Sequence, residues 1–138
     1  MKKQSLIDTG FMFAVLDESD AHHKSCATAF ETETNTLLPE IVLPELAYLL
    51  LRRADYKKLN KFLLSIVAGD FVLIPTELED LKRATEILEK YADSRVDFVD
   101  CVIVAIAERL NIKRILTVDR RHFSLFRPKH CDAFEILP

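Results

Sequence analysis

Short apolar segments alternate with longer amphipathic ones along most of the sequence. The short segments are typical of strands, and they lie at residues 4–8, 35–38, 71–74, 114–118 and 134–137. Strands that alternate with helices favour a mainly parallel sheet covered on both faces. The sequence therefore predicts an α/β fold, and functional sites in such sheets form at the carboxyl ends of the strands.

Helices are expected between these strands. Apolar spacing predicts them at residues 11–16, 21–32, 40–53, 55–68, 77–92 and 98–110, with an irregular turn or short helix at 120–126. Pro44 fits only the first turn of a helix, so the third helix should begin near Val42 or Leu43. Gly69 should end the fourth, and Thr76-Glu77-Leu78-Glu79 is a capping-box pattern for the fifth. Because segment 98–110 is apolar nearly all round, we expect it to pack deep against the sheet.

Length and composition indicate one domain spanning residues 1–138. A chain of 138 residues can bury a sizeable core, and two glycines leave no room for a flexible linker. The longest apolar stretches are too short to cross a bilayer. Cys26, Cys101 and Cys131 are odd in number and widely spaced, which predicts reduced thiols. We therefore expect a cytoplasmic protein without a membrane partner.

Charge is unevenly distributed, although the net charge is only −3. Residues 77–100 carry eight acids and four bases, whereas residues 109–130 carry seven bases and a single acid, Asp119. A run of charge is usually a solvated face, and the alternative here is a surface that contacts phosphates. The sequence leaves both interpretations open.

Two acids follow directly on predicted strands. Asp8 comes after Leu6-Ile7, and Asp119 comes after the strand at 114–118. Both should therefore lie at the carboxyl edge of the sheet, where an unpaired buried carboxylate costs several kcal/mol. Each also has a purely structural interpretation, since Asp8 could cap the next helix and Asp119 could form a turn.

Two further acids open the apolar helix at 98–110. Asp97 fits the N-cap position, and Asp100 falls in the first turn, where the helix dipole favours a carboxylate by ~0.3–1 kcal/mol. Capping alone could explain both residues. The burial expected of this helix nevertheless points its first turn at the same sheet edge.

Glu45 is the single charged residue within residues 41–51. This stretch is expected to be largely buried, and a buried carboxylate needs a cation as a partner. No basic residue lies one helical turn away on either side. A metal ion is therefore the natural candidate for that partner.

Four acids at one sheet edge form an oxygen-rich site of the kind that hard divalent cations prefer: Asp8, Glu45, Asp100 and Asp119. The chain has no glycine-rich phosphate loop, no G-x-S-x-G motif and no plausible Cys/His pairing, which argues against P-loop and side-chain nucleophile chemistry. His22 and His23 are expected to be surface or packing residues. His122 is at most a phosphate contact.

Four motifs in this order resemble the PIN-domain family, particularly the VapC-type toxin ribonucleases of toxin–antitoxin pairs. They are Leu6-Ile7-Asp8-Thr9, Pro44-Glu45-Leu46, Asp97-x-x-Asp100-Cys101-x-Ile103-Val104-Ala105, and Ile115-Leu116-Thr117-Val118-Asp119-Arg120-Arg121-His122-Phe123. The resemblance maps Asp8, Glu45, Asp100 and Asp119 onto the family's acids, and Thr9 and Thr117 onto hydroxyl positions that help orient the site. Asp97 departs from the Ser or Thr more often found there, so it is either a cap or a fifth metal ligand.

The resemblance implies a three-layer α/β/α fold with a sheet of about five parallel strands. It also implies an endoribonuclease that uses Mg²⁺ or Mn²⁺ to activate water for RNA hydrolysis, an antitoxin partner and homodimer formation. Arg120, Arg121 and Lys113 are the candidates to hold the RNA backbone beside Asp119.

Two alternatives remain at this point. A PIN scaffold could bind RNA or a protein partner without cutting RNA. A receiver-like signalling module would also place acids at strand ends. That module needs an adjacent acidic pair after the first strand and a lysine after the last, and Asp8-Thr9 and Leu137-Pro138 supply neither.

Overall fold

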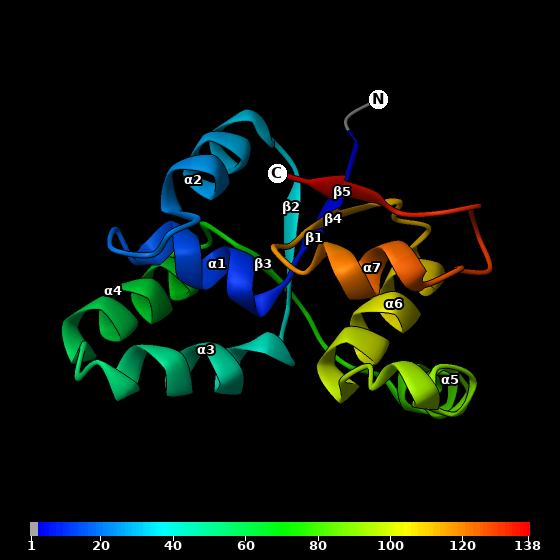
Figure 1. Ribbon diagram of the computed structural model, residues 1–138. Coiled ribbons are helices and arrows are strands. Elements are labelled where there is room, and N and C mark those ends of the chain that lie inside the picture. Colours follow the sequence, from blue (N-terminus) through cyan, green and yellow to red (C-terminus); the bar gives the residue numbers. More distant parts are fainter. Residues whose placement is uncertain (1–2) are drawn as a thin grey trace.

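The computed structural model describes residues 3–138, and its centre is a sheet of five parallel strands (Figure 1). The strands follow the spatial order β3-β2-β1-β4-β5. Their bounds are β1 (Ser5–Ile7), β2 (Thr36–Pro39), β3 (Val72–Ile74), β4 (Arg114–Leu116) and β5 (Glu135–Leu137). All five lie within or next to the predicted segments, and their uniform direction confirms the parallel sheet.

Strand β1 is central because its residues are apolar enough to be covered on both faces. All three of its residues are buried, and Leu6 pairs with Leu37 of β2 and with Ile115 of β4. The backbone N–H of Asp8 donates to the carbonyl of Leu116 at 2.9 Å. The residues that follow β1 and β4 therefore emerge side by side at one edge of the sheet.

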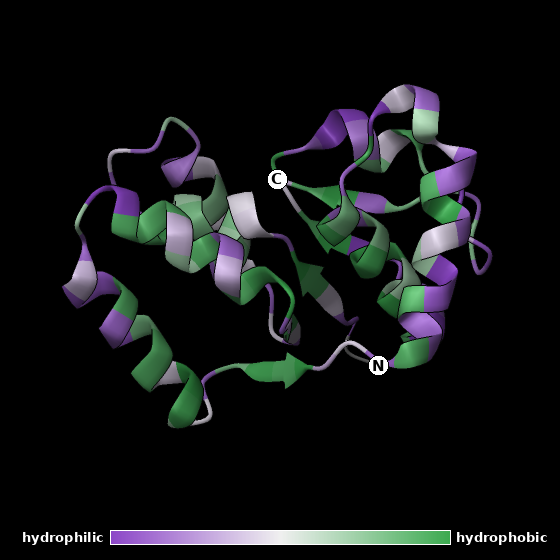
Figure 2. Cartoon of the chain, turned by 90° about the horizontal axis from the view of Figure 1, so that it is seen from below, coloured by the Kyte–Doolittle hydropathy of each residue, from purple (hydrophilic) through white to green (hydrophobic). Residues whose placement is uncertain are grey.

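The helices form the two outer layers (Figure 1). On one side of the sheet lie α1 (Thr9–Leu16), α2 (His23–Thr32), α3 (Val42–Arg52) and α4 (Tyr56–Val67), and on the other lie α5 (Leu78–Lys90) and α6 (Phe98–Leu110). The short helix α7 (Arg120–Leu125) contacts β5. Every residue of α6 from 100 to 107 is buried, which confirms the expected deep packing. The view from below shows hydrophobic strands between helices of mixed hydropathy (Figure 2).

The start of α5 differs from the prediction because of side-chain bonds at its first turn. The capping box of α5 lies one residue later than expected: Glu77 is the N-cap, and its N–H donates to the Asp80 carboxylate at 2.9 Å. Arg109 holds the same Asp80 carboxylate with two bonds of 3.0 Å, which fixes that register. Helix α5 ends at Lys90 and is followed by a 3₁₀ turn, η1 (Ala92–Ser94).

Other local predictions are confirmed. Gly69 follows the end of α4 with φ of +91°, a left-handed conformation that favours glycine. Pro44 lies in the first turn of α3. All three cysteines are free, and burial raises the pKa of Cys26 to about 11 and of Cys101 to about 12. Among the residues that the structure describes, no helix has the length and hydropathy of a membrane span.

Candidate active site

The acids singled out in the sequence come together in a cleft at the carboxyl ends of β1 and β4. Its volume is about 360 Å³. Its lining combines five acids with a few small and apolar groups: Asp8, Thr9, Gly10, Glu45, Tyr48, Leu49, Asp97, Asp100 and Asp119. All four predicted site acids and Asp97 are therefore in one place.

Asp8 is both a helix cap and a cleft residue. It is the N-cap of α1, where its Oδ1 accepts the Thr9 N–H at 2.8 Å. Its Oδ2 accepts the Thr117 hydroxyl at 2.7 Å. The side chain is buried, and this desolvation raises the pKa of Asp8 to about 6 despite the two hydrogen bonds.

Two threonines connect the acids. The Thr9 hydroxyl donates to Glu45 Oε1 at 2.6 Å. The Thr117 hydroxyl, besides donating to Asp8, accepts the backbone N–H of Asp119 at 2.9 Å. Thr9 and Thr117 thus contact three acidic residues, which lie directly after β1, on α3 and after β4.

Asp100 is the most strongly perturbed acid of the cleft. Only 4% of it is exposed, and burial raises its pKa to about 9, with the negative charges of Asp8, Asp97, Asp119 and Glu45 adding to the effect. Every one of these influences disfavours the ionised form. A divalent cation would relieve this repulsion, and carboxylate oxygens are the ligands it prefers, so the residues fit a metal site.

Asp119 and His122 form a second pair of possible ligands. Asp119 caps α7: its Oδ1 accepts the His122 N–H at 3.1 Å, and its Oδ2 lies 2.9 Å from His122 Nδ1. One donor atom each from Asp100, Asp119 and His122 lie within 4.8 Å of one another. The sequence did not indicate His122 as a possible ligand, because the surrounding run of bases suggested a phosphate contact. Its spacing of three residues from Asp119 at a helix start was the available signal.

The structure changes the arguments for Glu45 and Asp97. The expectation that Glu45 is buried is wrong, because it is half-buried and the core face of α3 consists of Val42, Leu46 and Leu50. Asp97 is the predicted cap of α6, and its Oδ1 accepts the Asp100 N–H at 2.8 Å. Asp97 is exposed at the mouth of the cleft.

The basic residues are only partly gathered at this edge. Arg120 is exposed and donates to the carbonyls of Ile136 and Pro138, so its guanidinium lies against β5. Arg121 is exposed in the first turn of α7. Lys113 precedes β4 and lies at the opposite edge, in a different hollow. The structure therefore does not bring Lys113 beside Asp119.

Other bases of the same run hold the fold together. Arg109 pairs with Asp80, and Arg114 pairs with Glu33 at 2.9 Å and Glu135 at 2.8 Å. The predicted basic stretch is therefore in large part structural.

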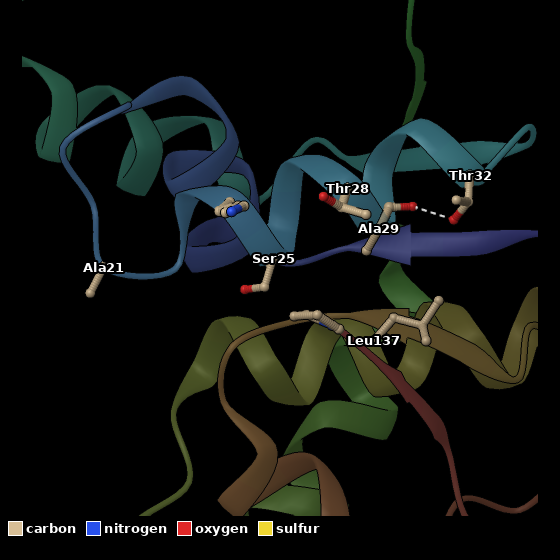
Figure 3. Close-up of a pocket in the computed structure, with 8 residues that line it drawn as sticks. Ala21, Ser25, Thr28, Ala29, Thr32 and Leu137 are labelled. Carbon is tan, nitrogen blue, oxygen red and sulfur yellow. Dashed lines mark hydrogen bonds between the residues drawn. The ribbon is translucent and has the colours of Figure 1, made fainter.

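A larger hollow lies away from the acids, between α2 and the chain after β5 (Figure 3). Its volume is about 600 Å³, and its lining is mainly small: Ala21, Lys24, Ser25, Thr28, Ala29, Thr32, Leu137 and Pro138. None of these lining residues is acidic, so the five acids described above belong to the smaller cleft.

Comparison with known proteins assigns the family. The PIN-domain family model matches residues 5–127. The chain therefore belongs to the PIN-domain family, which confirms the resemblance and sets the receiver-like alternative aside.

Individual relatives agree with this assignment. The chain is 29% identical over 134 residues to ribonuclease VapC26 of Mycobacterium tuberculosis, covering 96% of this chain and 99% of the relative. Its fold is similar to that of VapC20 of the same organism, a sarcin-ricin loop cleaving toxin, with a TM-score of 0.74, 19% identity, and coverage of 80% of this chain and 86% of the other. A chain of VapBC2 from Rickettsia felis bound to promoter DNA gives a TM-score of 0.66 at 17% identity, covering 98% and 99%.

Proposed function

We propose that this protein is a metal-dependent endoribonuclease in which residues 1–138 act as one domain, and that it is the toxin of a toxin–antitoxin pair. The observation that carries the proposal is the convergence of Asp8, Glu45, Asp100 and Asp119 on one cleft of a PIN domain. The complete set of acids favours cleavage over a scaffold that only binds RNA.

The four acids are the proposed ligands of one or two Mg²⁺ or Mn²⁺ ions. When bound, such an ion lowers the pKa of water and neutralises charge that develops on the phosphate. Asp8 and Asp100 supply buried oxygens, and Thr9 and Thr117 hold Glu45 and Asp8 in fixed orientations. Because the site needs no side-chain nucleophile, its residues act by binding, orienting and charge compensation.

Arg121 is the basic residue that we assign to the RNA backbone. It is exposed in the first turn of α7, directly after Asp119 and its neighbour Arg120. Arg120 is a second candidate once its bonds to the β5 carbonyls are exchanged for phosphate oxygens. We also propose a cytoplasmic location, which is compatible with an RNA substrate.

A protein partner fits the exposed apolar side of α4. Tyr56, Leu64 and Val67 are 67%, 59% and 82% exposed, and exposed apolar patches of this kind mark protein contacts. An antitoxin or a second copy of the chain would cover them. Light scattering of the purified chain detects a second copy, and co-expression with a candidate antitoxin followed by co-purification detects an antitoxin.

RNA cleavage in the presence of Mn²⁺, Mg²⁺ or EDTA tests the proposal directly. We expect cleavage with either ion, none with EDTA, and none for Asp8→Asn or Asp100→Asn. The matched control is Asp132→Asn, which removes one exposed acid from the segment before β5, at the other edge of the sheet. Activity that survives chelation or either site substitution contradicts the metal mechanism.

A further inference from the structure

An exposed aromatic side chain stands at the mouth of the acid cleft. Tyr48 lines the cleft, yet 63% of it is exposed. It lies on α3 three residues after Glu45, so both side chains occupy the same side of the helix. The guanidinium of Arg52, four residues further on, lies over the Tyr48 ring at 5.7 Å from its centroid.

Packing does not account for this tyrosine. The core face of α3 consists of Val42, Leu46 and Leu50, which are 0–1% exposed. Tyr48 therefore holds a large aromatic surface in water beside a cluster of carboxylates, where a tyrosine contributes little to the core. The guanidinium of Arg52 lies over its ring, and guanidinium groups commonly bind nucleic acids.

We propose that Tyr48 stacks on an unpaired RNA base next to the cleaved phosphate, and that Arg52 contacts a neighbouring backbone phosphate. This inference rests on the proposed ribonuclease function. Bases of single-stranded RNA stack on aromatic rings and guanidinium planes, whereas bases within a duplex are not accessible to them.

The geometry of α3 sets the scale of the contact. With a rise of about 1.5 Å per residue, Tyr48 lies ~4.5 Å and Arg52 ~10 Å beyond Glu45 along the helix axis. Acid, ring and guanidinium thus follow one another along a single stripe that leads out of the cleft. A strand that places its cleaved phosphate at the acids would pass the ring next. The arrangement therefore presents an aromatic face to an unpaired base beside the cleaved phosphate.

Binding measurements in a cleavage-incompetent background test the inference. In Asp100→Asn protein with Mg²⁺, Kd is measured by fluorescence anisotropy for a labelled single-stranded RNA that the wild type cleaves. We expect Tyr48→Leu to weaken binding about 5- to 160-fold, the range of one base–aromatic stack, and Tyr48→Phe to stay near the parent value. The control Leu78→Ala removes a large, exposed apolar side chain from α5, outside both the cleft and the apolar side of α4, and should leave Kd unchanged.

An RNA with one abasic nucleotide beside the cleavage point separates stacking from general effects. It should bind the parent more weakly than the intact RNA does, whereas Tyr48→Leu should bind both RNAs alike. In the cleavage-competent protein, Tyr48→Leu should raise KM more than it lowers kcat. Thermal melting of each variant shows that it is folded.

Three results overturn the inference: an unchanged Kd for Tyr48→Leu, an equal abasic penalty with and without the tyrosine, or a change in oligomeric state with RNA affinity intact. The last result would make Tyr48 a protein contact. Failure of the wild type to cleave any RNA overturns the proposed function instead, so the two failures are distinguishable.

Discussion

The raised pKa of Asp100 predicts that replacing this acid stabilises the metal-free protein. Asp100→Asn keeps the shape of the side chain and removes a carboxyl group whose pKa rises from 3.8 to about 9 on folding. The folded chain therefore holds a proton that the unfolded chain releases above about pH 4. By linkage, the contribution of Asp100 to the free energy of unfolding is most favourable below about pH 3.8 and becomes steadily less favourable as the pH rises towards 9.

The size of the effect follows from the same shift. One pKa unit corresponds to ~1.4 kcal/mol, so the penalty carried by Asp100 at pH 7 reaches at most ~4 kcal/mol. Asp8 shares the repulsion and takes up part of the proton, so we expect about half of this value, ~2 kcal/mol. For a chain of this size, that corresponds to a rise in Tm of roughly 6 °C.

Thermal and urea unfolding of EDTA-treated protein between pH 4.5 and pH 8 measures this difference. The gain of Asp100→Asn over the wild type should grow with pH, whereas Asp132→Asn should show no such trend. Adding Mn²⁺ should raise the Tm of the wild type more than that of Asp100→Asn, because the ion stabilises the folded state through the ionised acid. If Asp100→Asn is less stable than the wild type at pH 8, or if the difference does not change with pH, the electrostatic reasoning is refuted.

Three further predictions test single contacts. Thr117→Val should lower the free energy of unfolding in urea by ~1–3 kcal/mol, because it leaves Asp8 Oδ2 without its donor. Since this hydrogen bond lowers the pKa of Asp8, its loss should also move the acid limb of the pH–activity profile to higher pH. An unchanged acid limb would contradict this. A Cβ at Gly10 would lie 2.9 Å from Val118 Cγ2, so Gly10→Ala should lose ~1–3 kcal/mol, and Val118→Ala in the same chain should restore part of it. His122→Ala should weaken Mn²⁺ binding, measured by calorimetry, and unchanged affinity would exclude it as a ligand.

The sequence predicts the parts of the fold that depend on local pattern. Apolar runs locate every strand, and the strand ends place Asp8 and Asp119 at one edge, because a parallel sheet aligns its carboxyl ends. Glu45 was placed in the site by an argument from burial that the structure does not support. In the structure, the carboxylate of Glu45 is held at the cleft by a hydrogen bond from the hydroxyl of Thr9, which lies 36 residues earlier in the chain.

Contacts between distant segments could not be predicted in the same way. Lys113 precedes the predicted strand at 114–118 and Arg121 follows it, so the two residues belong at opposite edges of the sheet; grouping the bases by their closeness in the sequence overlooked this. The start of α5 depends on Arg109 binding Asp80, which is a tertiary contact. The N-cap preference of threonine alone favoured Thr76, one residue before the observed N-cap Glu77.

Three carboxylates of the cleft also begin helices: Asp8 for α1, Asp97 for α6 and Asp119 for α7. An alanine at any of these positions removes a reactive group and a cap worth ~1 kcal/mol at once, whereas an asparagine keeps the cap. An alanine scan of this protein would therefore mix loss of turnover with loss of folded material, and an asparagine scan would separate them. Substitutions at these positions that remove the cap therefore abolish cleavage and also reduce the amount of folded protein in the cell.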